Sequence, residues 1–185
     1  MQIQDCKIEG LKIIRLEMRE DNRGFFAERF HAQRFTEAGL PPFVQDNHSH
    51  SLPGVLRGLH YQHLSPQGKL VGCLSGKMWD VAVDIRPNSP TFGQHHAVEL
   101  SGENGLMFWI PEGFAHGFCV LGNQPADMLY KVTAYYNAAG EGGIRFDDLA
   151  LNIPWPVKQP IVSDRDRNLQ HWKDYAANPP LWGRA

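Results

Sequence analysis

The sequence is poor in cysteine, which limits both its covalent chemistry and its metal chemistry. Its three cysteines (Cys6, Cys73 and Cys119) are an odd number, and none of them forms a C-x-x-C pair. A disulfide framework or a zinc–thiolate site needs several paired or closely spaced cysteines, so we expect neither. This cysteine usage is typical of a reducing compartment, and it predicts a cytoplasmic protein.

A basic surplus and long apolar runs are also missing. The net charge is −2 with the nine histidines counted as neutral, whereas a nucleic-acid surface needs an excess of positive charge. No apolar run approaches the roughly 18 residues of a transmembrane helix, and residues 1–5 lack the basic start and apolar core of a signal peptide. We therefore expect no nucleic-acid partner and no membrane partner, although a few arginines could still bind one diphosphate.

Short strand-like segments make up much of the chain. Residues 78–85 alternate with a period of two, and Ser75-Gly76-Lys77 separates them from residues 69–74, which predicts a hairpin. Many short strands bounded by turn residues favour a sandwich or barrel with antiparallel pairing. Further strands are expected over residues 11–18, 95–100, 106–110, 115–121 and 128–134.

Helices are expected to be few and peripheral. Residues 32–38 are helix-like and are followed by Gly39 and two prolines, which end a helix. Residues 138–185 are rich in Pro, Asp, Gly and Trp, so we expect them to wrap the barrel as loops and a short helix. The 185 residues, 42% of them hydrophobic, suit a single domain with one core over residues 1–185.

Two stretches resemble the histidine motifs of the cupin superfamily. Gly54 and His60 match the start of the first motif, G-x5-H-x-H-x3/4-E, but Gln62 and Gln67 (or Pro66) stand at its next two ligand positions. The resemblance implies an all-β, cupin-type jelly-roll β-barrel with short peripheral helices. The second motif, G-x5-P-x-G-x2-H-x3-N, is matched at Gly105, Pro111, Gly113 and His116, with Val120 in place of its last residue.

The two amides decide what the histidines can do. A divalent metal in such a barrel needs about four imidazole or carboxylate ligands, and neutral amides are poor substitutes. Since Gln62 and Gln67 replace two of the ligands, we expect no bound metal. His60 and His116 then remain available for proton transfer.

Longer motifs resemble those of the dTDP-4-dehydrorhamnose 3,5-epimerases. They include residues 21–26 (DNRGFF), 55–62 (VLRGLHYQ) and 110–118 (IPEGFAHGF), and the similarity runs from about residue 10 to residue 170. The resemblance implies epimerisation at C3 and C5 of dTDP-4-dehydro-6-deoxy-D-glucose to dTDP-4-dehydro-L-rhamnose, without a cofactor. It also implies a homodimer that exchanges N-terminal segments.

The same resemblance assigns roles to individual side chains. It implies that His60 is the catalytic base, that Asp166 orients it, that Tyr130 is the proton donor and that Lys69 lies beside the C4 oxygen of the sugar. Besides Lys69, it implies substrate contacts for Arg23, Glu28, Gln45, Asn47, Arg57, His116, Glu141 and Arg165.

Elementary chemistry supports these assignments. Removing a proton beside a ketone gives an enolate, so the site needs a base near neutrality, a cation at the oxyanion and an acid on the opposite face. His60, Lys69 and Tyr130 supply these three groups, and the planar fork of Arg57 suits a diphosphate. In a regular strand Arg57 and His60 would point to different faces, but Gly58 can permit a bulge that changes this.

Three alternatives remain open on the sequence. One is an epimerase that inverts a single centre, C3 or C5, of a related dTDP-4-keto-6-deoxy sugar. The others are a metal-dependent cupin, which should carry His or Glu at positions 62 and 67, and a non-catalytic sugar-binding cupin. Residues 146–149 (FDDL) depart from the family pattern, and we expect them to reshape the pocket wall. For the homodimer we expect residues 11–18 to form an open edge strand that pairs with the partner.

Overall fold

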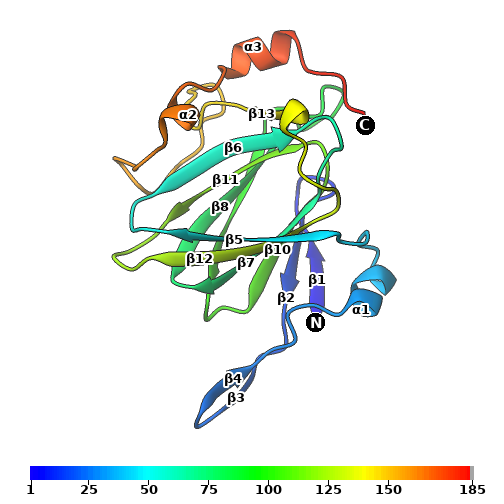
Figure 1. The fold of residues 1–185 in the computed structure, drawn as a ribbon, viewed down its shortest axis with the longest axis vertical. Coiled ribbons are helices and arrows are strands. Elements are labelled where there is room, and N and C mark those ends of the chain that lie inside the picture. Colours follow the sequence, from blue (N-terminus) through cyan, green and yellow to red (C-terminus); the bar gives the residue numbers. More distant parts are fainter. Residues whose placement is uncertain (184–185) are drawn as a thin grey trace.

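The computed structural model describes residues 1–183, which form two facing antiparallel sheets with short helices at the periphery (Figure 1). This architecture confirms the expected all-β, cupin-type barrel. In sheet order, the six-stranded sheet contains β1 (Gln2–Asp5), β2 (Lys12–Arg15), β10 (Leu106–Ile110), β7 (Lys69–Ser75), β12 (Ala126–Val132) and β5 (Gln45–Ser51). The five-stranded sheet contains β13 (Glu141–Gly143), β6 (Leu56–Gln62), β11 (Phe114–Val120), β8 (Lys77–Asp84) and β9 (His95–Ser101).

The expected hairpin of residues 69–74 and 78–85 is wrong, although the turn between them is real. β7 pairs with β10 and β12, whereas β8 pairs with β11 and β9, so the chain crosses from one sheet to the other at Gly76. Gly76 has a φ of +72°, and a Cβ there would lie 2.2 Å from the Pro125 carbonyl oxygen. The turn predicted at Gly76 is therefore correct, but the two strands that it joins belong to different sheets and do not pair with each other.

The expected open edge at residues 11–18 is also wrong. β2 pairs with β10 on one side and with β1 on the other, and β1 was not expected because it contains a single apolar residue, Ile3. The outer strands of this sheet are β1 and β5. β5 was missed as well, since its sequence QDNHSHS has no apolar member.

The core lies on both sides of the five-stranded sheet. Met78 and Ala82 of β8 belong to the cluster between the two sheets, whereas Val81 and Val83 belong to a second cluster on the outer face. The C-terminal third covers that outer face, and the hydroxyl of Tyr175 donates to the Ile85 carbonyl at 2.8 Å. This covering confirms the expected wrapping, which uses 3-10 helix η1 (Ala138–Gly140), α2 (Asp164–Arg167) and α3 (Trp172–Ala177).

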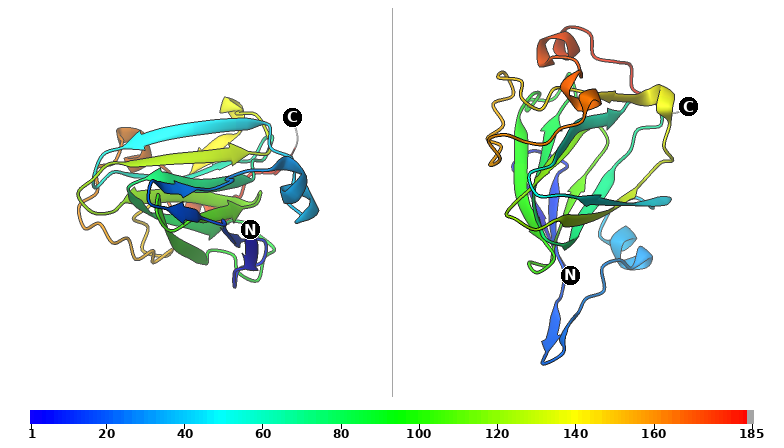
Figure 2. Two further views of the ribbon diagram at one scale, coloured as in Figure 1. Left: turned by 90° about the horizontal axis from the view of Figure 1, so that it is seen from below. Right: turned by 60° about the vertical axis from the view of Figure 1, so that its left-hand side comes forward.

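A small hairpin projects from the barrel near the N-terminus. Its strands, β3 (Arg19–Asp21) and β4 (Gly24–Phe26), pair only with each other, and the right-hand view in Figure 2 shows them extending below the barrel. The following helix α1 (Ala32–Glu37) agrees with the helix expected over residues 32–38. Among residues 1–183, no helix is long and apolar enough to cross a membrane.

Candidate active site

A polar cavity of about 190 Å³ lies between the two sheets. β5, β7 and β12 supply part of its wall from the six-stranded sheet, and β6 and β13 supply the opposite part. Six of the side chains predicted for the site meet in it. The lining consists of Gln45, Asn47, His60, Tyr61, Gln62, Gln67, Lys69, Tyr130, Tyr136 and Glu141.

A larger groove of about 610 Å³ lies where β7 turns into β8, around Gly76 and Gly122. Its wall consists mainly of glycine, leucine and uncharged polar residues, and none of the predicted site residues lines it. Size alone therefore does not identify the functional site. The smaller cavity is the candidate because acid, base and cation converge there.

His60 and Asp166 form a hydrogen-bonded pair although they are 106 positions apart. Nε2 of His60 lies 2.8 Å from Oδ1 of Asp166, and the backbone N–H of Gly58 donates to Oδ2 at 3.1 Å. Burial alone would raise the pKa of Asp166, but hydrogen bonds from His60 and Gly58 hold it below its ordinary value. Because an ionised carboxylate accepts the proton of Nε2, Nδ1 of a neutral His60 is free to act as a base.

The local sequence explains where Asp166 sits. Ser163 caps α2, and its hydroxyl accepts from the backbone N–H of Asp166 at 3.1 Å. The capped turn holds Asp166 against β6, with only 4% of the residue exposed. The sequence alone gave no physical reason to join Asp166 to His60, and the structure now supplies the contact.

The predicted bulge at Gly58 is confirmed. His116 pairs with His60 and Phe118 with Arg57, so β6 has one more residue than β11 between these pairs. Gly58 has a φ of +124°, and a Cβ there would lie 2.6 Å from the Gly117 Cα, which only glycine avoids. The extra residue changes the alternation of β6 between Arg57 and His60.

Arg57 is fixed beside the cavity by the end of β5. Its Nε donates to the Ser51 hydroxyl at 3.0 Å, and its Nη2 donates to the His50 carbonyl at 3.3 Å. The guanidinium is close enough to Tyr130 for its charge to oppose, in small part, the rise that burial causes in the pKa of that phenol. Arg57 is thus a cation at the border of the cavity without a carboxylate partner among its hydrogen bonds.

Lys69 and Tyr130 approach the cavity from the six-stranded sheet. Burial lowers the pKa of Lys69 to about 8, while the negative charges of Asp80 and Glu141 act in the opposite direction. Burial also raises the pKa of Tyr130, against a smaller effect of a hydrogen bond with Asn47, which lies opposite on β5. A phenol with a raised pKa keeps its proton at neutral pH, as a proton donor must.

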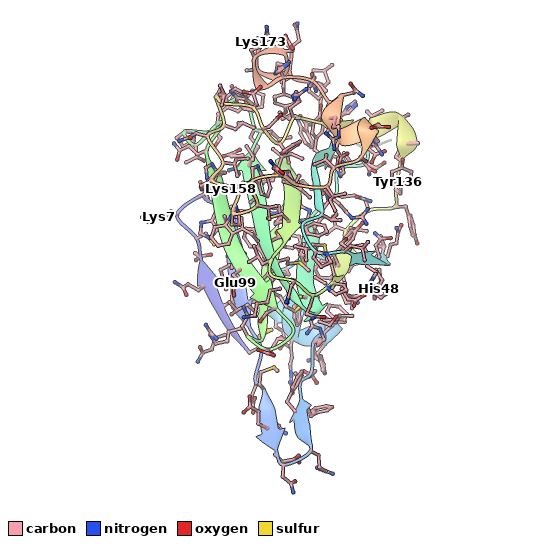
Figure 3. All side chains as sticks on the ribbon, turned by 90° about the vertical axis from the view of Figure 1, so that its left-hand side faces the viewer. Lys7, His48, Glu99, Tyr136, Lys158 and Lys173 are labelled. Atoms are coloured by element: carbon pink, nitrogen blue, oxygen red, sulfur yellow. The ribbon has the colours of Figure 1, made fainter. Side chains whose placement is uncertain are left out.

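Tyr136, Glu141 and Arg165 form a second polar group at the cavity. The Tyr136 hydroxyl donates to Oε2 of Glu141 at 2.7 Å, and Nη2 of Arg165 lies 2.8 Å from the same oxygen. Burial alone would raise the pKa of Glu141, but these two partners lower it. Tyr136 is 57% exposed as a residue and lies at the edge of the molecule in Figure 3.

Six predicted site residues are not part of the cavity lining. Arg57, Arg165 and Asp166 lie beside it, as described above, whereas the other three have different surroundings. Arg23 lies in the projecting hairpin and pairs with Asp21, and Glu28 pairs with Arg34 at 2.6 Å. His116 is buried behind the wall, where its Nε2 lies 3.0 Å from each carboxylate oxygen of Asp80. One chain therefore does not assemble the whole predicted substrate-binding set.

The two amides at the cupin ligand positions have a structural role that the sequence did not indicate. Gln62 accepts from the Asn137 backbone N–H at 2.8 Å and donates to the Tyr135 carbonyl at 3.2 Å. Gln67 donates to the Ala134 carbonyl at 2.8 Å. Both amides thus fasten the segment 134–137, which carries Tyr136, to the barrel. Within residues 1–183, no three His, Cys, Asp or Glu side chains are grouped so that they could hold a metal ion.

We expect turnover to survive removal of metal ions. Treatment with a strong chelator, followed by desalting, should leave the rate unchanged, because the amide positions are occupied by backbone hydrogen bonds. Elemental analysis of the same samples is the accompanying measurement. Stoichiometric metal together with a chelator-sensitive rate would overturn this expectation.

Residues 146–149 do not reshape the cavity, contrary to expectation, because they are not part of its lining. Asp147 pairs with Arg145 at 2.7 Å, and Asp148 accepts from the backbone N–H of Trp172 at 2.9 Å. The segment therefore fastens α3 to the barrel. The sequence departure concerns this attachment and not the lining of the candidate cavity.

Comparison with known proteins agrees with this geometry. The family model of dTDP-4-dehydrorhamnose 3,5-epimerase matches residues 5–174. The chain is 50% identical over 178 residues to the dTDP-4-dehydrorhamnose 3,5-epimerase of Shigella flexneri, an alignment that covers 94% of this chain and 97% of the relative. A dTDP-4-dehydrorhamnose 3-epimerase of Streptomyces niveus is 37% identical over 171 residues, covering 91% of this chain and 82% of the relative.

Solved structures give the same result. The epimerase RmlC from Legionella pneumophila, crystallised in complex with dTDP-4-keto-L-rhamnose, superposes with a TM-score of 0.92 at 48% identity. That match covers 100% of this chain and 99% of the other. The chain therefore belongs to the dTDP-4-dehydrorhamnose 3,5-epimerase family, and it is an epimerase, as its motifs predicted.

Proposed function

We propose that the cavity inverts C3 and C5 of dTDP-4-dehydro-6-deoxy-D-glucose to give dTDP-4-dehydro-L-rhamnose. The observation that carries this proposal is the convergence of His60, Lys69 and Tyr130 on one cavity, with Asp166 bonded to His60. The relatives with higher identity are named as 3,5-epimerases, and the Legionella relative binds dTDP-4-keto-L-rhamnose.

Each side chain takes one step of the reaction. Nδ1 of His60 removes the proton from the carbon beside the ketone, and the Asp166 carboxylate stabilises the imidazolium that forms. The developing charge on the C4 oxygen is held by the ammonium of Lys69. Tyr130 then delivers a proton to the opposite face of the carbon, which inverts it.

The other polar residues suit the nucleotide part of the substrate. Arg57 carries a planar cation that can bind diphosphate oxygens bidentately. Gln45 and Asn47 present amides from β5, and the Glu141–Arg165 pair supplies further polar contacts. Tyr136 has an exposed ring on which a nucleobase can stack.

The second candidate is an epimerase that inverts a single centre. The same base, acid and cation serve one inversion as well as two, and the Streptomyces niveus relative is named as a 3-epimerase. Its identity of 37%, against 50% for the Shigella flexneri relative, favours inversion at both carbons.

The deciding experiment incubates the protein with dTDP-4-dehydro-6-deoxyglucose in deuterated water. NMR then reads deuterium and configuration at C3 and at C5. Inversion with deuterium at both carbons supports the proposal, and inversion at one carbon supports the second candidate. If the protein catalyses neither deuterium exchange nor inversion, both candidate functions are refuted.

A homodimer completes the proposed site. Arg23 and the 68% exposed Phe26 lie in the β3–β4 hairpin, which extends beyond its own barrel (Figure 1). We propose that the hairpin of one subunit reaches the cavity of its partner, where Arg23 binds the diphosphate. Glu28, just after the hairpin, would join the same site.

Light scattering should therefore show twice the mass of the 20.9 kDa chain. Arg23→Ala should raise KM about tenfold or more with little change in kcat, because a contact to an unreacting part of the substrate is lost. Arg19→Ala is the matched control, since Arg19 lies in the same hairpin and pairs with Glu17. A monomer at working concentration, or equal effects of the two substitutions, would contradict the proposed assembly.

We also propose that the enzyme works in the cytoplasm. All three cysteines are free thiols, and Cys73 and Cys119 are buried. Burial raises the pKa of the Cys73 thiol to about 11 and that of Cys119 to about 12, so both stay protonated. Unpaired thiols suit a reducing compartment.

A further inference from the structure

Asp80 is a buried carboxylate beside the site to which the proposed reaction assigns no role. It lies on β8 between Met78 and Ala82, both of which pack in the core between the sheets, and it is fully buried. Its oxygens each lie 3.0 Å from Nε2 of His116, and His116 pairs across the strands with His60. A carboxylate in this apolar interior needs a compensating partner.

The hydrogen bond to Asp80 determines the state of His116. Burial lowers the pKa of His116, and although Asp80 acts in the opposite direction, the ring remains harder to protonate than an exposed histidine. A neutral imidazole carries one proton, and the carboxylate requires it on Nε2. His116 is therefore a hydrogen-bond donor to Asp80 and does not neutralise its charge.

Lys69 is the cation that Asp80 can balance. Burial lowers the pKa of Lys69, and the negative charge of Asp80 is the strongest influence that raises it. The charge of Glu141 on β13 is the next strongest. The other titratable groups around it do not supply negative charge at neutral pH. They are His116 on β11, His60 and Tyr61 on β6, Tyr130 on β12, and Tyr136. The buried carboxylate thus acts on the lysine from inside the barrel, where water screens little.

We infer that Asp80 is a positioning residue of the epimerase site: its buried charge keeps Lys69 cationic beside the substrate ketone and holds His116 in one tautomer. This inference rests on the proposed function, because it gives a reason for the cation that the enolate requires. Asp80 acts through Lys69 and His116 and does not itself touch the sugar.

The direct test measures the protonation of Lys69 by NMR of the full-length protein labelled at lysine Cε and Nζ, with Lys69→Arg assigning the signal. Asp80→Asn should move the titration midpoint of Lys69 downward by about 1 pH unit, because a nearby opposite charge is removed. Asp84→Asn is the matched control. Asp84 is equally buried on the same strand, but it is bonded to Arg86, Ser89 and Thr91. An unchanged midpoint in Asp80→Asn, or equal shifts in both variants, would overturn the inference.

The pH dependence of turnover separates this inference from the proposed function. Activity that needs charged Lys69 falls as the pH rises through the pKa of Lys69. The alkaline limb of the pH–rate profile should therefore move to lower pH in Asp80→Asn and stay in place in Asp84→Asn. If the NMR midpoint moves while the alkaline limb does not, the inference about Asp80 stands and the role of Lys69 in catalysis is wrong. If neither moves, the inference about Asp80 is wrong.

A measurement on the unmodified protein covers the case in which Asp80→Asn does not fold. Nitrogen NMR of the His116 ring should show a neutral imidazole protonated at Nε2. A ring protonated at Nδ1 would contradict the Asp80 contact and overturn the inference. His116→Gln should leave the alkaline limb near its original position, because it keeps the charge of Asp80.

Discussion

Replacing His60 by asparagine is expected to lower both turnover and deuterium wash-in by a factor of about 10²–10⁴. The imidazole is the base of the proposed reaction, and because its Nε2 is bonded to Asp166, its Nδ1 is the nitrogen left to take the substrate proton. Asparagine can keep a hydrogen bond to that carboxylate but cannot act as a base. Rates of epimer formation and of deuterium incorporation, both read by NMR, measure the effect.

The fold must survive for this result to be informative. Thermal unfolding should show a melting temperature close to that of the unmodified protein, since His60 is partly exposed in the cavity. His95→Asn is a matched control on β9, away from the cavity lining, and should retain full activity. Substantial exchange at C3 and C5 in His60→Asn would transfer the base role to another group, with His116 the first to be tested.

Tyr130→Phe is expected to separate proton removal from inversion. His60 can take a proton and return it to the same face, so exchange with solvent deuterium needs only the base. Inversion needs a donor on the opposite face, and the substitution removes that hydroxyl while keeping the ring. We therefore expect continued deuterium incorporation into at least one carbon, with inverted product formed at least about 100-fold more slowly.

The ratio of deuterium incorporation to epimer formation is the quantity to compare. Tyr175→Phe serves as the control, because it removes a buried hydroxyl that donates to the Ile85 carbonyl and does not line the cavity. That variant should lose stability and keep the ratio. If Tyr130→Phe inverts both centres at the original rate, the acid is Tyr136 or an ordered water.

The sequence predicted strands better than it predicted their partners. Alternation identified residues 78–85 and the turn at Gly76, but a period of two does not reveal which sheet a strand joins. Both faces of β8 are buried, and nothing in the alternation of residues 78–85 distinguishes the buried Asp80 from an exposed polar residue. β5 was missed because its inward side chains, such as Gln45 and Asn47, line a cavity instead of a core.

A site residue could be predicted from the sequence when a motif of neighbouring residues surrounds it. His60 is marked by the cupin motif around it, whereas Asp166 could be joined to it only through the family resemblance. Lys69 and Tyr130 likewise carry no local signal that distinguishes them from a solvated lysine or a core tyrosine. Gln62 and Gln67 showed which ligands had been lost, but their hydrogen bonds to segment 134–137 depend on a loop about 70 positions away.

The division of the cavity between two sheets has a consequence for evolution and for engineering. The proposed base stands on β6 of one sheet, while the proposed acid and cation stand on β12 and β7 of the other. In the proposed site the sugar would lie between two walls whose spacing, about 10 Å for packed sheets, is set by core side chains outside the cavity lining. Substitutions of core residues such as Met128 and Phe108 would therefore change the spacing of the walls, and with it which ring carbon faces the proposed base. Libraries aimed at changing double inversion into single inversion should vary this filling and leave the reacting groups untouched.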